Sequence, residues 1–87
     1  MKINLKQQQL IDELLFKIKE KYPEVVLKDL QASPDDPEDI WINIIADMDE
    51  EREIELRAYS AELTTEILSD YGYALSIMPE NPNAIYV

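Results

Sequence analysis

Apolar residues recur every three or four positions near the start of the chain, a spacing typical of an amphipathic helix. The spacing predicts a helix over residues 5–21, whose apolar stripe comprises Leu10, Ile11, Leu14, Leu15 and Ile18. Asn4 and Gln7 have the spacing of a capping pair at its start. Pro23 disfavours helical geometry in the residue before it, so we expect the helix to end there.

The segment 40–46, IWINIIA, alternates as a strand does and is largely apolar on both faces. Its two faces carry, in turn, Ile40, Ile42 and Ile44, and Trp41, Asn43 and Ile45. Apolar side chains on both faces are typical of a central strand. The β-branched and partly alternating segment 24–31 predicts a strand before it, and YALSIM, residues 73–78, predicts a strand after it.

A longer helical pattern begins at Asp47 or Asp49 and continues to about Tyr71. Asp47 and Glu50 have capping-box spacing, and acidic residues suit the positive N-terminal end of a helix dipole. The apolar side of this helix is expected to comprise Ile54, Ala58, Ala61 and Leu68, widened by Leu63 and Ile67. Gly72, the only glycine, is expected to end the helix in left-handed geometry.

The charged side of this second helix is interpreted as a solvated surface. Its members are Glu51, Arg52, Glu55, Glu62 and Glu66. Glu53 and Arg57, four residues apart, are expected to form an ion pair there. A second interpretation, a docking surface for a basic protein, stays open.

The predicted order of elements is α-β-β-α-β, an α+β fold in two layers. A strand–helix–strand crossover is right-handed, which places the last strand parallel to the central one. We therefore expect a three-stranded mixed sheet with both helices packed on one face. Residues 1–87 fit one small domain, and residues 79–87 are expected to form a tail that contains prolines.

Composition excludes several classes of function. The chain has no cysteine and no histidine, which excludes disulfides, thiolate chemistry and histidine as a general base. Its net charge of −11 repels nucleic-acid phosphates and anionic lipids, so we expect a protein partner or a second copy, and no nucleic acid or membrane. No stretch has the pattern of a signal peptide or a spanning helix, which predicts a cytoplasmic protein.

The segment SPDDPEDIW, residues 33–41, concentrates acidic residues directly before the central strand. The candidates for a loose Mg²⁺ site are Asp35, Asp36, Glu38 and Asp39. The other interpretation is a solvated loop whose carboxylates cap turn amides. The spacing does not match an EF-hand loop, so we assign no metal ligand. Because the serines have no histidine to activate them, we also assign no catalytic residue, and we assign no cofactor-binding residue.

From the end of the first helix to the last strand, the predicted elements follow one another through the segment YPEVVLKDLQASPDDPEDIWINIIADMDEEREIELRAYSAELTTEILSDYGYALSIM. This run resembles the core of small, stand-alone minimal nucleotidyltransferases, and the likeness covers residues about 10 to 79. The chain is also similar, in its DPEDIW and SDYGY segments, to short bacterial proteins that have no assigned function.

In the minimal nucleotidyltransferases, a Gly-Ser pair binds the triphosphate and two carboxylates, two residues apart on a strand, hold divalent cations. Here Ala32 and Ser33 stand at the Gly-Ser position. Asp39 stands at the first carboxylate and Trp41 at the second, and residues 73–78 include no acid. The resemblance therefore implies the fold of the family without its activity.

Trp41 has two interpretations, a core residue or a residue that contacts a partner. With both helices on one face, Trp41 and Ile45 are expected on the other face, where they predict an interaction surface. We therefore predict a non-catalytic, nucleotidyltransferase-like protein-interaction module without a cofactor, either antitoxin-like or self-associating. The alternatives are a divergent Mg²⁺-dependent nucleotidyltransferase that uses Ser33, Asp39 and the loop acids, and a small structural subunit of an assembly.

Overall fold

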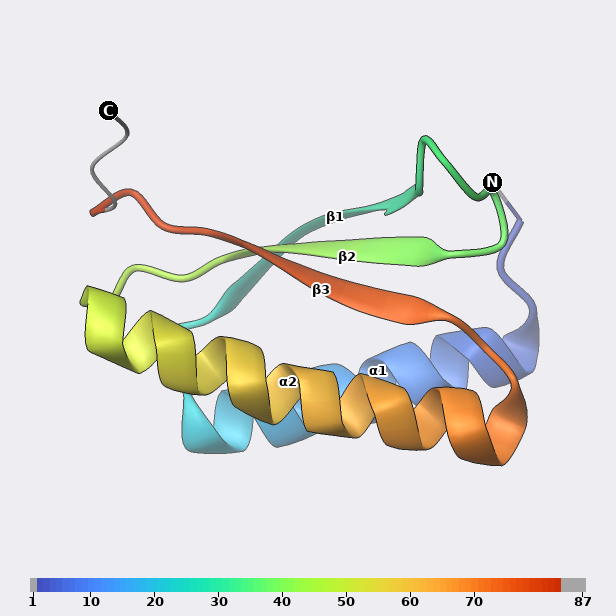
Figure 1. The fold of residues 1–87 in the computed structure, drawn as a ribbon, viewed down its shortest axis with the longest axis horizontal. Coiled ribbons are helices and arrows are strands. Elements are labelled where there is room, and N and C mark those ends of the chain that lie inside the picture. Colours follow the sequence, from blue (N-terminus) through green and yellow to red (C-terminus); the bar gives the residue numbers. More distant parts are fainter. Residues whose placement is uncertain (1, 84–87) are drawn as a thin grey trace.

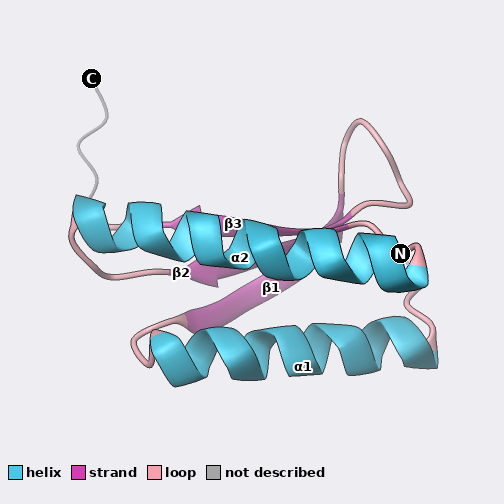
Figure 2. Ribbon diagram, turned by 60° about the horizontal axis from the view of Figure 1, so that its bottom comes forward, coloured by secondary structure: helices cyan, strands magenta, loops and turns pink. Residues whose placement is uncertain are grey.

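The structure, a computed structural model, describes residues 2–83. Its elements in chain order are α1 (Leu5–Lys21), β1 (Val26–Ala32), β2 (Ile40–Ile45), α2 (Glu50–Tyr71) and β3 (Leu75–Glu80). Figure 1 shows two layers, with both helices below the sheet, and Figure 2 shows the helices lying side by side, α1 toward β1 and α2 toward β3. The predicted α-β-β-α-β order and three-stranded mixed sheet are confirmed.

The central position of β2 follows from its apolar residues on both faces. The strand order is β1-β2-β3, with β1 antiparallel to β2 and β3 parallel to β2. The ladder between β1 and β2 shifts register between Leu27 and Asp29, so Lys28 lies in an irregularity of the edge strand. Among residues 2–83, neither helix is long and apolar enough to cross a membrane.

The core lies between the sheet and the two helices. Ile40, Ile42 and Ile44 are at most 2% exposed and face the helices, as the alternation predicted. From α1, the core receives Leu10, Ile11, Leu14 and Ile18. The predicted apolar stripe of α1 is therefore confirmed, with Leu15 packed at its margin.

Both helix starts are capped by side chains. The Asn4 side chain accepts from the Gln7 backbone and the Gln7 side chain accepts from the Asn4 backbone, so the predicted capping pair is present. Of the two candidate caps for α2, Asp49 is the one that acts, because its carboxylate accepts from the Arg52 backbone N–H at 2.8 Å. Gly72 ends α2 in the left-handed conformation, with φ 76°.

The predicted apolar side of α2 is wrong. Leu56 and Ser60 are its buried residues, with Leu63 and Ile67 packed partly against the core. The residues expected to face the core lie instead on exposed positions: Ile54, Ala58, Ala61 and Leu68. The reason is tertiary, because α2 docks against β3 on one side and α1 on the other, and those contacts select a different face.

The predicted tail, residues 79–87, begins before the last strand ends. β3 extends to Glu80, and Pro79 and Glu80 pair with Ile44 and Ile45. Residue 74 and residue 80 direct their carbonyls to β2, so by alternation the Pro79 nitrogen points to the open edge, where no ladder hydrogen bond is lost.

The three residues after β3 are also held to the fold. Asn81 is buried and its side chain donates to the Met48 carbonyl at 2.8 Å. Asn83 donates to the carboxylate of Asp47. Asp47 does not cap α2, because the helix begins at Glu50, directly after Asp49. Residues 84–87 of the expected tail lie outside the described residues.

Candidate functional site

The acidic connection between β1 and β2 is a turn closed by its own hydrogen bonds. The Ser33 N–H donates to the Asp39 carbonyl at 2.8 Å, and the Asp39 N–H donates to the Asp36 carbonyl. The Asp36 carboxylate accepts from the Glu38 N–H at 3.0 Å, which is the turn-capping role expected of such a side chain. Figure 1 shows this connection rising on the side of the sheet away from the helices.

The predicted metal candidates do not converge. Asp35, Asp36 and Glu38 are exposed, whereas Asp39 is half-buried. The Asp39 carboxylate accepts from the Ser76 hydroxyl, at 3.1 Å and 3.3 Å from its two oxygens, and so links the connection to β3. Within residues 2–83, no group of three or more acidic side chains is placed to hold one metal ion.

Ser33 stands where the resemblance implied a triphosphate contact. Its side chain is buried, and its hydroxyl accepts from the Asp35 N–H at 3.3 Å, so it stabilises the turn. A hollow at this end of the sheet is lined in part by Ala32, Ile40 and Tyr73, but Trp41 is not among its lining residues.

Trp41 and Ile45 lie on the face of the sheet away from the helices, which we call the open face. By strand register and alternation it comprises Val26, Asp29, Gln31, Trp41, Asn43, Ile45, Ser76, Met78 and Glu80. No element among residues 2–83 covers it (Figure 1). The structure thus places both predicted surface residues on one uncovered face.

The open face has apolar side chains at both of its ends. Trp41 is half-buried and lies between Gln31 of β1 and Ser76 of β3. At the other end, four residues further along β2, Ile45 pairs with Val26, and these two side chains are 37% and 54% exposed. Val26 and Ile45 thus form an adjacent pair of exposed β-branched side chains on this face.

Polar side chains between these ends bond to one another. The Asn43 amide donates to Asp29 at 2.6 Å and to Gln31 at 2.9 Å. At the Ile45 end, where Glu80 is the β3 neighbour of Ile45, Lys28 and Glu80 form an ion pair at 3.0 Å that joins the two edge strands. The hydrogen bond that Lys28 donates to the Glu80 carboxylate raises the pKa of Lys28. Most polar side chains of the open face thus bond to one another or to the β1–β2 connection, whereas Trp41, Ile45 and Val26 form its partly exposed apolar part.

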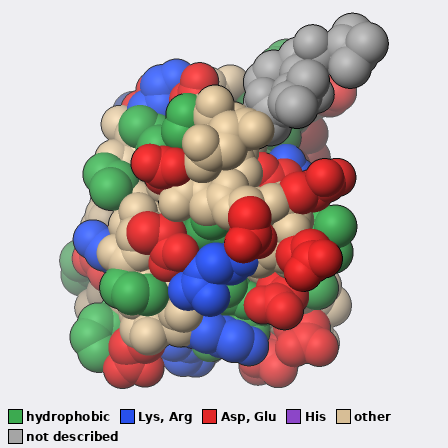
Figure 3. All heavy atoms as spheres, turned by 90° about the vertical axis from the view of Figure 1, so that its left-hand side faces the viewer, with side chains coloured by type: hydrophobic (Ala, Val, Ile, Leu, Met, Phe, Trp, Pro, Cys, Tyr) green, Lys and Arg blue, Asp and Glu red, His purple; other side chains and the backbone are tan. Residues whose placement is uncertain are grey.

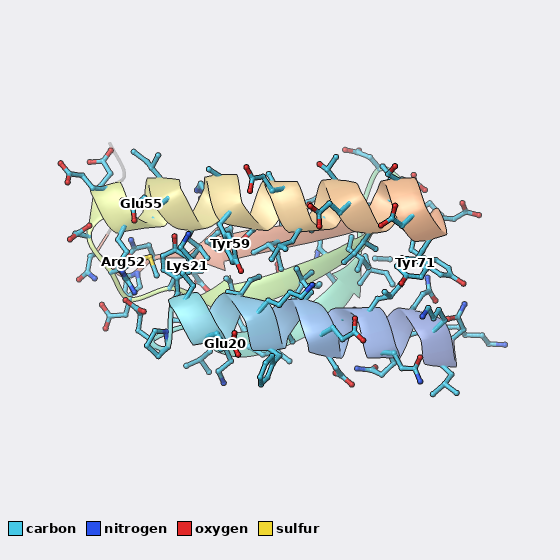
Figure 4. All side chains as sticks on the ribbon, turned by 90° about the horizontal axis from the view of Figure 1, so that it is seen from below. Glu20, Lys21, Arg52, Glu55, Tyr59 and Tyr71 are labelled. Carbon is cyan, nitrogen blue, oxygen red and sulfur yellow. The ribbon has the colours of Figure 1, made fainter. Side chains whose placement is uncertain are left out.

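A second cluster, which the sequence interpretation missed, joins α1 to α2. The guanidinium of Arg52 donates to Glu24 at 2.6 Å and 3.1 Å, and lies 4.7 Å from the centroid of the buried Tyr22 ring. Lys21 lies over the ring of Tyr59 at 4.4 Å, and Figure 4 shows it with Arg52 between the helices. The bond from Arg52 lowers the pKa of Glu24. Arg52 thus links the two helices while its side chain stays 38% exposed.

Acidic side chains gather at the end where α2 begins, as Figure 3 shows. The first turn of α2 contributes Glu50, Glu51 and Glu53. The predicted ion pair between Glu53 and Arg57 is present at 3.0 Å.

Comparison of the chain with protein-family models, with curated proteins and with solved structures found no match.

Proposed function

We propose that this chain is a non-catalytic, cytoplasmic protein-interaction module that binds a basic partner protein through its open face. The observation that carries the proposal is the exposed apolar pair Ile45 and Val26, at one end of a face whose other end carries the half-buried Trp41 and which no described element covers. Covering these side chains removes apolar area from water, which is the main favourable term in protein association.

The charge around the open face favours a basic partner. The exposed acids of the β1–β2 connection rise on the same side of the sheet, and Asp29 lies on the face itself. Within a chain of net charge −11, these carboxylates lie beside the apolar Trp41 end of the open face. A partner that presents apolar side chains together with lysine or arginine complements this surface, and the attraction speeds encounter.

In this proposal, the chain shares its fold with the nucleotidyltransferases that it resembles but does not catalyse nucleotidyl transfer. Asp39, at the position of the first family carboxylate, is engaged by the Ser76 hydroxyl. Trp41, at the position of the second, supplies apolar surface to the open face. An antitoxin-like role is one form of such binding, and a small subunit of an assembly is another.

The alternative activity is a divergent Mg²⁺-dependent nucleotidyltransferase. Its one supporting observation is that Ser33 and Asp39 lie together, joined by the hydrogen bond between their backbones at 2.8 Å. Both side chains already have protein partners, Asp35 and Ser76 respectively, so we rank binding above catalysis.

Photo-crosslinking in the native cell tests the binding proposal. A photoreactive side chain is placed at Ile45, on the open face, and in a control at Glu62, exposed on α2. We expect one basic protein to be linked from position 45 and not from position 62. A crosslink between two copies at position 45 would instead indicate self-association through the open face.

The linked protein is then purified and titrated with substituted chains. Ile45→Asp is expected to weaken binding roughly tenfold or more, because a charge replaces an apolar contact. Phe16→Asp, an exposed apolar residue of α1, is the matched control and should bind as the parent does. Equal binding by both variants, or no crosslink from position 45, would overturn the proposal.

A further inference from the structure

β3 presents an open backbone edge. The N–H groups of Ile40 and Ala46 donate to the carbonyls of Ala74 and Glu80, so even-numbered residues of β3 direct their backbone to β2. The N–H and C=O groups of Leu75 and Ile77 therefore point away from the sheet. Such an edge is a template for another strand.

The other edge strand, β1, is protected against further pairing. Its ladder is irregular between Leu27 and Asp29. An irregular ladder is a common means of blocking an edge. In β3 only Pro79, near the end, lacks an N–H. The edge of β3 is thus the more receptive of the two.

The flank of α2 beside this edge has a regular apolar pattern. Ile54 and Leu68 are 59% and 51% exposed, and Ala61 lies midway between them, seven residues from each. Arg57 is the one charged residue of this flank between Ile54 and Leu68, and Glu53 neutralises it. Residues seven apart share one side of a helix, so these side chains form a straight stripe.

The edge of β3 and the stripe of α2 meet at one point. A hollow of about 240 Å³ opens there, lined by Arg57, Ser60, Ala61, Thr64, Ser76 and Ile77. It therefore lies at the middle of both the stripe and the strand. The Ser60 hydroxyl in its lining is buried and has no hydrogen-bond partner among the described residues.

We propose that a second copy of this chain docks here about a two-fold axis that passes through the hollow. β3 then pairs antiparallel with its counterpart, and Leu75 of one copy exchanges backbone hydrogen bonds with Ile77 of the other. Each α2 lies antiparallel to the other, with Ala61 facing Ala61 and Ile54 facing Leu68. The contact is self-complementary, as an interface with two-fold symmetry requires.

Charge selects a second copy over a basic peptide at this surface. The chain carries a net charge of −11, yet the stripe carries one arginine that is already paired. By helical spacing, Glu55, Glu62 and Glu66 fall on another side of α2. Two copies therefore meet without direct repulsion, whereas a basic strand would find no acidic margin. This contact is separate from the open face, and it joins two open faces into one six-stranded surface.

Sedimentation equilibrium tests the inference, because the dimer has twice the 10.1 kDa chain mass. We expect the parent chain and Phe16→Glu to sediment as dimers. Ala61→Glu, which places like charges at the axis, should raise the dissociation constant roughly tenfold or more. A monomeric parent chain at ~100 µM, a concentration that exceeds typical dimer constants, would overturn the inference, as would equal dimerisation of Ala61→Glu and Phe16→Glu.

Crosslinking locates the contact independently of the charge substitution. Because the chain has no cysteine, a single Ala61→Cys reports only on contact between copies. A short bismaleimide should join two Ala61→Cys chains and leave Phe16→Cys chains unjoined. Dimers that persist in the parent and in Ile45→Asp exclude association through the open face, and joining of Phe16→Cys in place of Ala61→Cys would refute the two-fold arrangement. Circular dichroism of each variant checks that the chain is folded.

Discussion

Removal of the Tyr22 hydroxyl should stabilise the protein. Tyr22 is 1% exposed, and its hydroxyl is buried without a hydrogen-bond partner among residues 2–83. A buried polar group in that state costs about 1–3 kcal/mol of folding free energy. Tyr22→Phe removes the cost and keeps the ring against Tyr59, whose centroid lies 6.1 Å away.

The expected gain is about 1 kcal/mol, the lower end of that range, because the hydroxyl also fills volume in the core. For a domain of this size, the gain corresponds to a rise in Tm of roughly 4–8 °C. Urea unfolding followed by far-ultraviolet circular dichroism measures the free energy directly. Tyr59→Phe, at a half-buried ring, is the control and should change stability little. Destabilisation of Tyr22→Phe by about 1 kcal/mol or more would refute the reasoning, since it would mean that the hydroxyl makes a favourable bond.

Three further predictions follow from single residues. Arg52 lowers the pKa of Glu24, so their ion pair stabilises the fold at pH above the ordinary glutamate pKa, and this contribution is lost as pH falls through the lowered pKa. Glu24→Gln should therefore be less stable than the parent at pH 7. The difference should vanish in unfolding curves measured in acid. Gly72→Ala should lower the free energy of unfolding in urea by about 1 kcal/mol, because φ is 76°. No atom lies near the added Cβ, so the loss reports the backbone conformation alone, and an unchanged free energy would contradict the left-handed cap. Calorimetry with Mg²⁺ and ATP should show no heat of binding that depends on Asp39. Binding heat in the parent chain that is lost in Asp39→Asn would favour the enzymatic alternative.

Local patterns in the sequence predicted most of the fold. The alternation of 40–46 identified the central strand, and the capping pair at Asn4 and the left-handed Gly72 identified helix ends. Each of these features depends on residues close together in the chain, and the structure confirms them. The end of β3 was missed because Pro79 reads as a strand breaker, although an edge strand accepts it.

Features that depend on distant residues could not be predicted. Apolar residues lie on several sides of α2, so its periodicity alone did not show that Leu56 and Ser60 would face the core. The ion pair between Glu24 and Arg52 spans 28 residues, and no local pattern indicates it. The open face was predicted because strand alternation and the placement of both helices were sufficient for it.

Fluorescence of Trp41, the single tryptophan of the chain, tests the central claim most directly. The purified partner that crosslinks from position 45 is added at low salt, and the emission is followed as binding saturates. Burial of the indole in the complex predicts a shift of emission to shorter wavelength. Binding should weaken as salt is added, because the acidic residues beside the open face contribute to attraction. Saturable binding that leaves the emission of Trp41 unchanged and is insensitive to Ile45→Asp would contradict the open-face account.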